Sequence, residues 1–266
     1  MVVDENKLKY YEEYYFSSAT PIPFQVKNGG YILHIKPVTV SMYPFYRDNV
    51  SVLTIDKNRI NDAKIISMSY LQYLVDIVLP QDKAYQHALF TILSISLGDD
   101  YKYTVGHLDN GKAYLGVYQE DEILCRIVAK EFDRISEIIL NYNDREYDDR
   151  YISEDLRKAM EDFYNIKYKD QHVPTLEEKK AFVSFKSGLT LNQLNEMSYR
   201  HFDIMYNHCV KNDLFFADKI IQASEKYKVN EEIVYPLFKK KSDKYSEFLQ
   251  DAGSFERRVS AAAQGG

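Results

Sequence analysis

The sequence contains no tryptophan, and only two cysteines and ten glycines among its 266 residues. Two thiols cannot form the disulfide framework that stabilises small secreted domains, so the composition favours a reducing compartment. The glycines form neither the dinucleotide-binding pattern GxGxxG nor a phosphate-binding loop. The zinc-protease pattern HExxH and the hydrolase pattern GxSxG are absent as well. The sequence therefore predicts a non-enzymatic protein with no cofactor.

Long apolar runs are also missing. No stretch reaches the roughly 18 consecutive apolar residues that suggest a membrane-spanning helix. The N-terminal stretch MVVDENKLKYYEEYYF is acidic and lacks the apolar region of a signal peptide. The net charge of −6 disfavours nonspecific binding to nucleic acid, which requires a basic surface. We therefore expect contact with neither membrane nor nucleic acid.

Tyrosine and phenylalanine are abundant, with 24 and 14 copies. A tyrosine combines an apolar ring with a hydroxyl that needs a hydrogen-bond partner, and it is enriched where protein surfaces meet. The same residue also fills the boundary between core and surface. Composition alone leaves both uses open.

The pattern along the chain predicts an α+β fold in two domains. We expect an arm at 1–20 and an N-terminal domain at 21–142, in which two β-hairpins pack on helices. A charged linker at 143–152 should lead to an all-α helical domain at 153–250. A flexible tail is expected at 251–266.

Turn residues place the two hairpins. Asn28, Gly29 and Gly30 lie between alternating apolar residues, and the sequence Asp-Asn-Gly at 109–111 does so in the second hairpin. Between and after the hairpins, apolar residues recur at helical spacing over 61–79, 82–97 and 120–141. We predict one helix for each of these three ranges.

Capping residues place the C-terminal helices. Ser153 should begin a helix that runs to about residue 168, by N-cap preference. Thr175 and Glu178 form a capping box, and Gly188 should end that helix. Three further residues, each a good N-cap, should begin helices: Thr190, Asn212 and Asn230.

The stretch LNEMSYRHFDIMYNHC brings two histidines and a cysteine together. His201 and His208 are two helical turns, or about 10 Å, apart, which is too far for both to bind one metal ion. Cys209 lies about 100° around the helix from His208, so the imidazole is badly placed to activate the thiol. We therefore predict no metal or catalytic site here, and an unreactive Cys209 within a packed helix. Cys125 should be equally inert.

The C-terminal helices are instead the predicted partner-binding region. Five aromatic residues are the candidates: Tyr199, Phe202, Tyr206, Phe215 and Phe216. Phe215 and Phe216 are adjacent and point about 100° apart on a helix, so they cannot share one narrow apolar face. Either the helix is buried on most sides, or one of the two rings faces a groove or a partner.

Three stretches together carry a family resemblance. They are PIPF with IKPVTVSMYPFY, then VLTIDKNRINDAKIISMSYLQYLVDIV, and finally LTLNQLNEMSYRHFDIMYNHCVKND. The combination resembles tail assembly chaperones and baseplate-hub assembly proteins of tailed bacteriophages. The segment NEMSYRHFDIMYN is similar to the C-terminal helix of that family, in which a Met-Ser-Tyr or Met-Thr-Tyr turn precedes an apolar stripe.

The resemblance implies a non-enzymatic chaperone or scaffold for the tape-measure protein. Its partners would be phage tail proteins, either the tape-measure protein or baseplate-hub components, and self-association is possible. It would act in the host cell cytoplasm during assembly. The alternative is a permanent component of the virion, in the baseplate or the tail connector.

Overall fold

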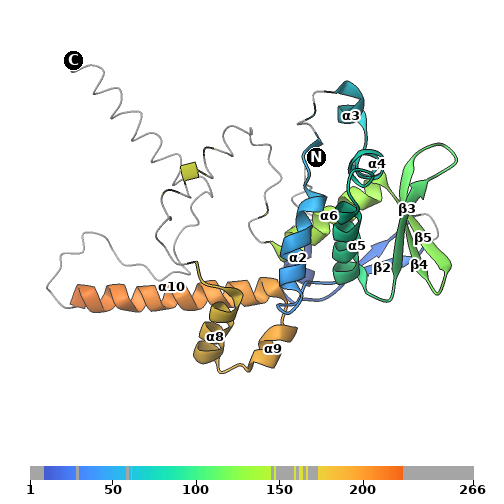
Figure 1. Cartoon of the computed structure of the whole chain (residues 1–266). Coiled ribbons are helices and arrows are strands. Elements are labelled where there is room, and N and C mark those ends of the chain that lie inside the picture. The colour runs from blue at the N-terminus through green and yellow to red at the C-terminus, as the bar shows by residue number, and fades with distance from the viewer. Residues whose placement is uncertain are drawn as a thin grey trace, which may run out of the picture. The chain divides into compact units, whose positions relative to one another are not determined.

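The computed structural model describes residues 9–27, 30–57, 60, 62–144, 147, 159, 162, 163, 166 and 173–223. The chain divides into two compact units. The first comprises Met1–Tyr147 with Val183–Met205, and the second comprises Asp148–Phe182 with Tyr206–Gly266. The fold is α+β, as predicted: two small antiparallel sheets pack on helices, and helices follow (Figure 1).

The first hairpin joins β1 (Ile22–Gln25) to β2 (Ile32–Ile35). The strands are antiparallel, and their inward-facing residues are buried while the alternate ones are exposed. Gly30 has a φ of 65°, which a residue with a side chain rarely adopts. The predicted hairpin is confirmed.

The second hairpin is part of a three-stranded sheet with the order β3–β4–β5. Its strands are β3 (Lys102–His107), β4 (Ala113–Gln119) and β5 (Glu122–Val128). Three residues, Asp109 to Gly111, connect Leu108 to Lys112, and Gly111 has a φ of 75°. The Leu108 amide donates to the Lys112 carbonyl at 2.9 Å, which makes these two residues a hydrogen-bonded pair.

The helix predicted over 120–141 is wrong in its first part. Glu120 and Asp121 have φ angles of 48° and 73° and form a tight turn, which leads into β5. Cys125 and Ile127 are buried in alternation and pair with β4. The helix α6 (Ala129–Asn143) begins only afterwards. Apolar residues four apart fit one face of a helix and one face of a strand, so spacing alone did not separate the two.

The helix predicted over 61–79 is also not continuous. Met68 and Ser69 have extended backbones, with ψ angles of 150° and 158°. The Ser69 hydroxyl then accepts a hydrogen bond from the Gln72 amide and caps a new helix. Three short segments result: α3 (Ala63–Ser67), α4 (Tyr70–Tyr73) and the π-helical η4 (Leu74–Val78).

The same Met-Ser-Tyr sequence separates α9 from α10. Met197 is extended, with a ψ of 147°, and the Ser198 hydroxyl lies 3.4 Å from the His201 amide. The triplet thus ends one helix and begins the next at both of its positions in the chain.

Two helical segments of the first unit lie around the sheets. The predicted helix at 82–97 is confirmed as α5 (Lys83–Leu97), which is capped by the Asp82 carboxylate. A segment that the pattern did not predict, α2 (Tyr43–Asn49), continues into the short 3-10 helix η2 (Val50–Leu53).

The N-terminal segment belongs to the core of the first unit. Residues 9–16 are helical and end in the π-helical η1 (Glu12–Phe16). The Phe16 ring is buried, and its centroid lies 4.7 Å from that of Tyr142. The described part of the predicted arm is therefore packed.

The C-terminal helices are α8 (Leu176–Ser187), α9 (Leu191–Glu196) and α10 (Tyr199–Ala223). The capping box of Thr175 and Glu178 is confirmed, and so is the helix end at Gly188, whose φ is 75°. Thr190 caps α9 as predicted. The start predicted at Asn212 is wrong, because α10 runs through this residue without a break.

Several predicted features lie wholly or mostly outside the described residues. They are the linker at 143–152, the helix from Ser153 to about 168, the helix start at Asn230 and the tail at 251–266.

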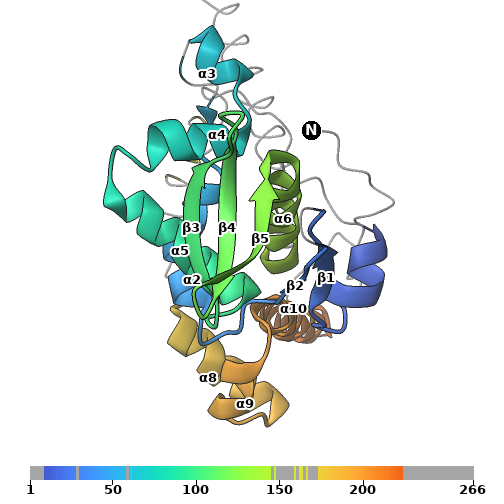
Figure 2. The same cartoon turned by 90° about the vertical axis from the view of Figure 1, so that its right-hand side faces the viewer.

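One face of the three-stranded sheet carries the core. In Figures 1 and 2, α4, α5 and α6 lie on one side of this sheet, and no described helix covers the other side. The buried side chains of β4 and α6 meet on the covered side: Ala113, Leu115, Val117, Phe132, Ile135 and Ile139. No described helix is both long and apolar enough to cross a membrane.

Glu131 is a buried carboxylate that joins α6 to both sheets. Its Oε1 accepts the Lys27 amide at 2.8 Å, and its Oε2 accepts the Val128 amide at 3.1 Å. In Glu131→Gln, one of these two acceptors becomes an amide nitrogen, which leaves a backbone donor unsatisfied. We expect a loss of about 1–3 kcal/mol in the free energy of unfolding, measured with urea. Lys130→Gln, on the exposed side of the same helix, is the control and should change it by less than about 0.5 kcal/mol.

Candidate functional site

The first two turns of α10 are fixed within the first unit. The Tyr199 amide donates to the Val38 carbonyl at 2.7 Å, and the Tyr199 ring stacks on Tyr43 with centroids 3.2 Å apart. Burial, together with the neighbouring Tyr43, raises the pKa of Tyr199 well above its ordinary value. Phe202 is 1% exposed. Two of the five candidate aromatics therefore pack inside the protein.

Arg200 lies between these two aromatic residues and is itself 8% exposed. Its guanidinium donates to the Asn141 carbonyl at 2.9 Å, lies 3.4 Å from the Glu12 carboxylate and covers the Phe16 ring at 4.9 Å. A buried cation without such partners would cost several kcal/mol. Arg200 thus joins the N-terminal segment, α6 and α10, a role that no sequence pattern indicated.

Tyr206 belongs to the second unit and has partners there. Its ring meets Phe182 edge-on, with centroids 6.0 Å apart, and the Lys179 ammonium lies 5.0 Å from its ring centre. These contacts hold the Tyr206 side chain, which is half-buried, against α8. It is a packing residue in this structure.

Phe215 and Phe216 differ in environment, as their 100° separation requires. Phe215 is half-buried, and the Lys219 ammonium lies 5.7 Å from its ring centroid. Phe216 is 55% exposed. Of the five candidates, Phe216 alone presents most of its ring to solvent.

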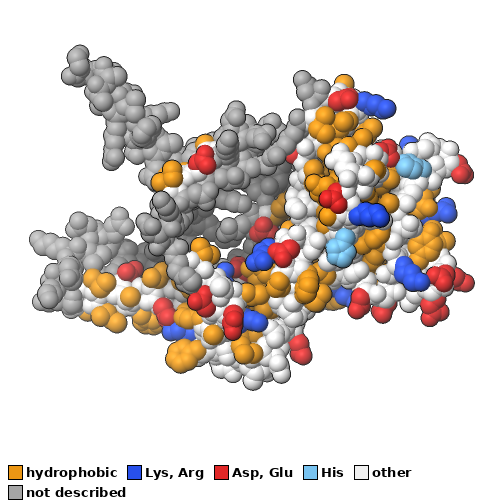
Figure 3. Space-filling view, viewed as in Figure 1, with side chains coloured by type: hydrophobic (Ala, Val, Ile, Leu, Met, Phe, Trp, Pro, Cys, Tyr) orange, Lys and Arg blue, Asp and Glu red, His pale blue; other side chains and the backbone are white. Residues whose placement is uncertain are grey.

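Phe216 has apolar neighbours on the same face of α10. Leu214, Ile220 and Ile221 are 59%, 70% and 44% exposed, and Ala217 lies between them. At 100° per residue, these five positions span about 160° of the helix surface. We call them the α10 apolar face; Figure 3 shows apolar side chains gathered along this helix. Sequence analysis had selected aromatic residues alone and so missed Leu214, Ile220 and Ile221.

The histidines and cysteines near this helix do not form a cluster. His201 is half-buried, His208 is exposed and Cys209 is half-buried. Among the described residues, no group of three or more His, Cys, Asp or Glu side chains could hold a metal ion.

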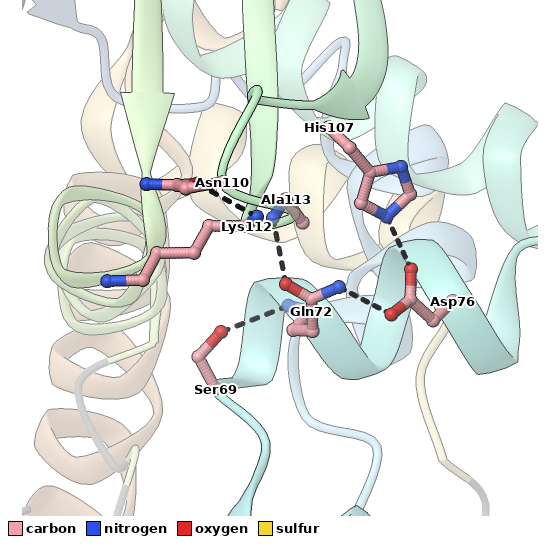
Figure 4. A network of polar contacts seen from close by, with 7 residues as sticks. All are labelled: Ser69, Gln72, Asp76, His107, Asn110, Lys112 and Ala113. Carbon is pink, nitrogen blue, oxygen red and sulfur yellow. Dashed lines mark hydrogen bonds and ion pairs between the residues drawn. The ribbon is translucent and has the colours of Figure 1, made fainter.

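A second polar constellation connects η4 to the β3–β4 hairpin (Figure 4). His107 Nε2 lies 2.7 Å from Asp76 Oδ1, and the Gln72 side chain donates to the other Asp76 oxygen. Gln72 Oε1 accepts the Ala113 amide at 2.8 Å. The side chains of Gln72, Asp76 and His107 therefore satisfy one another's hydrogen bonds. The network holds the helical segment of Gln72 and Asp76 against the β3–β4 hairpin and presents no reactive group.

The Asp76 network generates a pH-dependent contribution to stability. Partial burial by itself raises the pKa of this carboxyl, but hydrogen bonds from Gln72 and His107 outweigh it and hold the pKa below its ordinary value of 3.8. A depressed folded-state pKa stabilises the fold above the unfolded pKa, and this stabilisation is lost as pH falls through the folded value.

We expect Asp76→Asn to unfold more easily than the parent at pH 6, by up to about 1 kcal/mol because the site is partly exposed. The difference should shrink as pH falls below about 4. Urea titrations of both proteins from pH 6 to pH 3 measure it. A difference that stays constant over this range would contradict the assignment.

The two thiols should react at different rates. Burial, with a smaller effect from Glu131, raises the pKa of Cys125 to about 11, so little thiolate forms near neutral pH. Cys209, which the sequence analysis expected to be unreactive within a packed helix, is only half-buried. At pH 8, Ellman's reagent should modify Cys209 at least about tenfold faster than Cys125. Cys209→Ser should remove the fast phase, whereas Cys125→Ser should remove the slow one; any other assignment contradicts the prediction.

Comparisons with known proteins add no relative. No protein-family model matches the chain, and neither does any curated protein or any solved structure.

Proposed function

We propose that this protein is a non-enzymatic assembly factor of a bacteriophage tail or baseplate. Its client is the tape-measure protein or a baseplate-hub component, and it acts in the host cytoplasm. The resemblance of the three stretches quoted above supports the phage context. The α10 apolar face supports a binding role and is the observation that carries the proposal.

The chemistry of this face fits an amphipathic client helix. Leu214, Phe216 and Ile220 are each more than half exposed, on a helix that also carries exposed polar residues such as Lys211 and Asp218. Contiguous exposed apolar side chains commonly mark interaction surfaces. Covering each of them would contribute roughly 1–2 kcal/mol, because about half of each side chain remains to be buried. A client helix with apolar residues three and four apart would supply that cover.

The polar groups of the first unit support a structural rather than a catalytic use. Tyr70, Tyr103 and Tyr142 have strongly raised pKa values because they are buried, and each hydroxyl donates to a backbone carbonyl. Asp76 and His107 are engaged with each other. These groups hold elements together, which is consistent with a protein that works by binding.

The test replaces the exposed side chains of the α10 apolar face with polar ones. Leu214→Ser, Phe216→Ser and Ile220→Ser together should leave the melting temperature within a few degrees of the parent, because the three residues contribute little to the core. Capture of the co-expressed tape-measure protein of the same phage should fall at least about tenfold. The three substitutions remove more than about 1.4 kcal/mol of the binding free energy that burial of these side chains contributes.

Phe202→Ala is the matched control, since it removes a buried ring of the same helix. It should destabilise the protein by about 3–5 kcal/mol, with no selective loss of capture by the protein that remains folded. Undiminished capture by the triple variant would refute the proposed role of this face. Mass spectrometry of purified virions separates the two phage roles, because stoichiometric presence of the chain would identify a permanent virion component instead of a chaperone.

A further inference from the structure

The strand β3 forms one edge of the three-stranded sheet. Leu108 and Lys112 are a hydrogen-bonded pair, and such pairs alternate along an antiparallel ladder. With Lys102 opposite Tyr118 and His107 opposite Ala113, the residues of β3 that bond to β4 are therefore Lys102, Thr104 and Gly106. The amide and carbonyl groups of Tyr103, Val105 and His107 point the other way, out of the sheet.

These outward groups have no partner among the described residues. No strand of the described chain lies beyond β3, and no backbone or side-chain hydrogen bond there involves the amides or carbonyls of Tyr103, Val105 or His107. Such a row of unpaired donors and acceptors is a template for adding a strand.

The edge lacks two of the features that usually prevent strand addition, a proline and a bulge. β3 contains no proline, and the irregularity of the sheet lies between Val117 and Tyr118, where β4 pairs with β5. The Lys102 ammonium pairs with Asp121 at 2.9 Å. Natural edge strands are typically guarded by a proline, a bulge or charged side chains, and of these β3 carries only a charge at its first residue, Lys102, which Asp121 neutralises, and the histidine at its last. On the helix-covered side, the half-buried rings of Tyr103 and Phe90 lie close together, with centroids 6.3 Å apart, where an added strand could cover them.

We infer that β3 pairs with β3 of a second copy of this chain, in antiparallel orientation. The strand is self-complementary when Val105 faces Val105 of the other copy and Tyr103 faces His107. Each of these facing pairs then exchanges two backbone hydrogen bonds, because all the residues involved have outward amides and carbonyls. The result is a continuous six-stranded sheet across a two-fold axis, which is the symmetry of most homodimers.

The side chains fit this register. Thr104 lies opposite Gly106, and Lys102 lies opposite Leu108, so no like charges face each other across the new pair. Both small residues pair with Gly116 and Tyr114 of β4, so they lie on the side of the sheet opposite the buried Leu115 and Val117. A strand from an unrelated protein would need to match this pattern, whereas a second copy matches it by symmetry.

The test removes one outward amide without touching the bonds between β3 and β4. Val105→Pro replaces that amide with a ring, and proline is tolerated in an edge strand where its nitrogen faces outward. Val105→Ala is the matched control, since it trims the same side chain but keeps the amide. We expect the parent and Val105→Ala to dimerise in sedimentation equilibrium, and Val105→Pro to have a dissociation constant at least about tenfold higher.

Residue-resolved hydrogen exchange identifies the surface and keeps the inference testable if Val105→Pro unfolds. In the parent protein, the amides of Tyr103, Val105 and His107 should gain protection as concentration rises, whereas those of Thr104 and Gly106 should be protected at every concentration. A dimer whose outward amides stay unprotected, or a monomer up to millimolar concentration, would overturn the inference. Protection that appears only when a tail protein is added would also overturn it, in favour of a strand from that protein. The triple α10 variant should leave this protection unchanged, which separates this inference from the proposed function.

Discussion

The last turn of α6 is the constraint on which the first unit depends. Asn143 accepts the Val38 amide at 2.9 Å, and the carbonyl of Asn141 accepts the Arg200 guanidinium at the same distance. The Tyr142 hydroxyl between them donates to the Thr20 carbonyl. Consecutive residues thus hold segments that are between 59 and 122 positions away in the sequence. Each of these groups is in a largely buried setting, where a polar atom that loses its partner costs about 1–3 kcal/mol.

Buried tyrosines elsewhere in the first unit also hold separate segments together through hydrogen bonds to the backbone. The Tyr70 hydroxyl donates to the Val52 carbonyl and accepts the Ile55 amide, which fixes the loop after η2 against α4. The Tyr103 hydroxyl bonds to the Gly98 carbonyl and so fixes the end of α5 against β3. Burial raises the pKa of both phenols, so they remain protonated donors throughout the physiological range. A chain without tryptophan and with many tyrosines therefore uses the ring for the core and the hydroxyl to satisfy loop carbonyls.

Local chemistry allowed much of the fold to be predicted from the sequence. Turn glycines and capping boxes act through their immediate neighbours, so both hairpins and the ends of α8 and α9 followed from residues such as Gly111, Thr190 and Gly188. The error at 120–141 arose because isoleucines four positions apart suit a strand and a helix equally well. The Glu120–Asp121 turn decided between them, and it was not recognisable because neither residue is a glycine. The burial of Arg200 and the stacking of Tyr199 on Tyr43 depend on partners far away in sequence, which no local pattern encodes.

Only part of the candidate binding face on α10 could be predicted from local sequence. Helix geometry alone established that Phe215 and Phe216 point in different directions, but which of them would be exposed depended on the packing of the second unit. That packing leaves Phe216 exposed together with Leu214 and Ile220. A surface made of side chains can adapt to different client helices, because apolar contact has little directional preference. The edge of β3 is different in kind, since backbone hydrogen bonds fix both the direction and the register of whatever pairs with it. The two proposed surfaces would therefore act differently: pairing through β3 would give a complex of fixed geometry, whereas α10 would accept apolar helices of varying sequence.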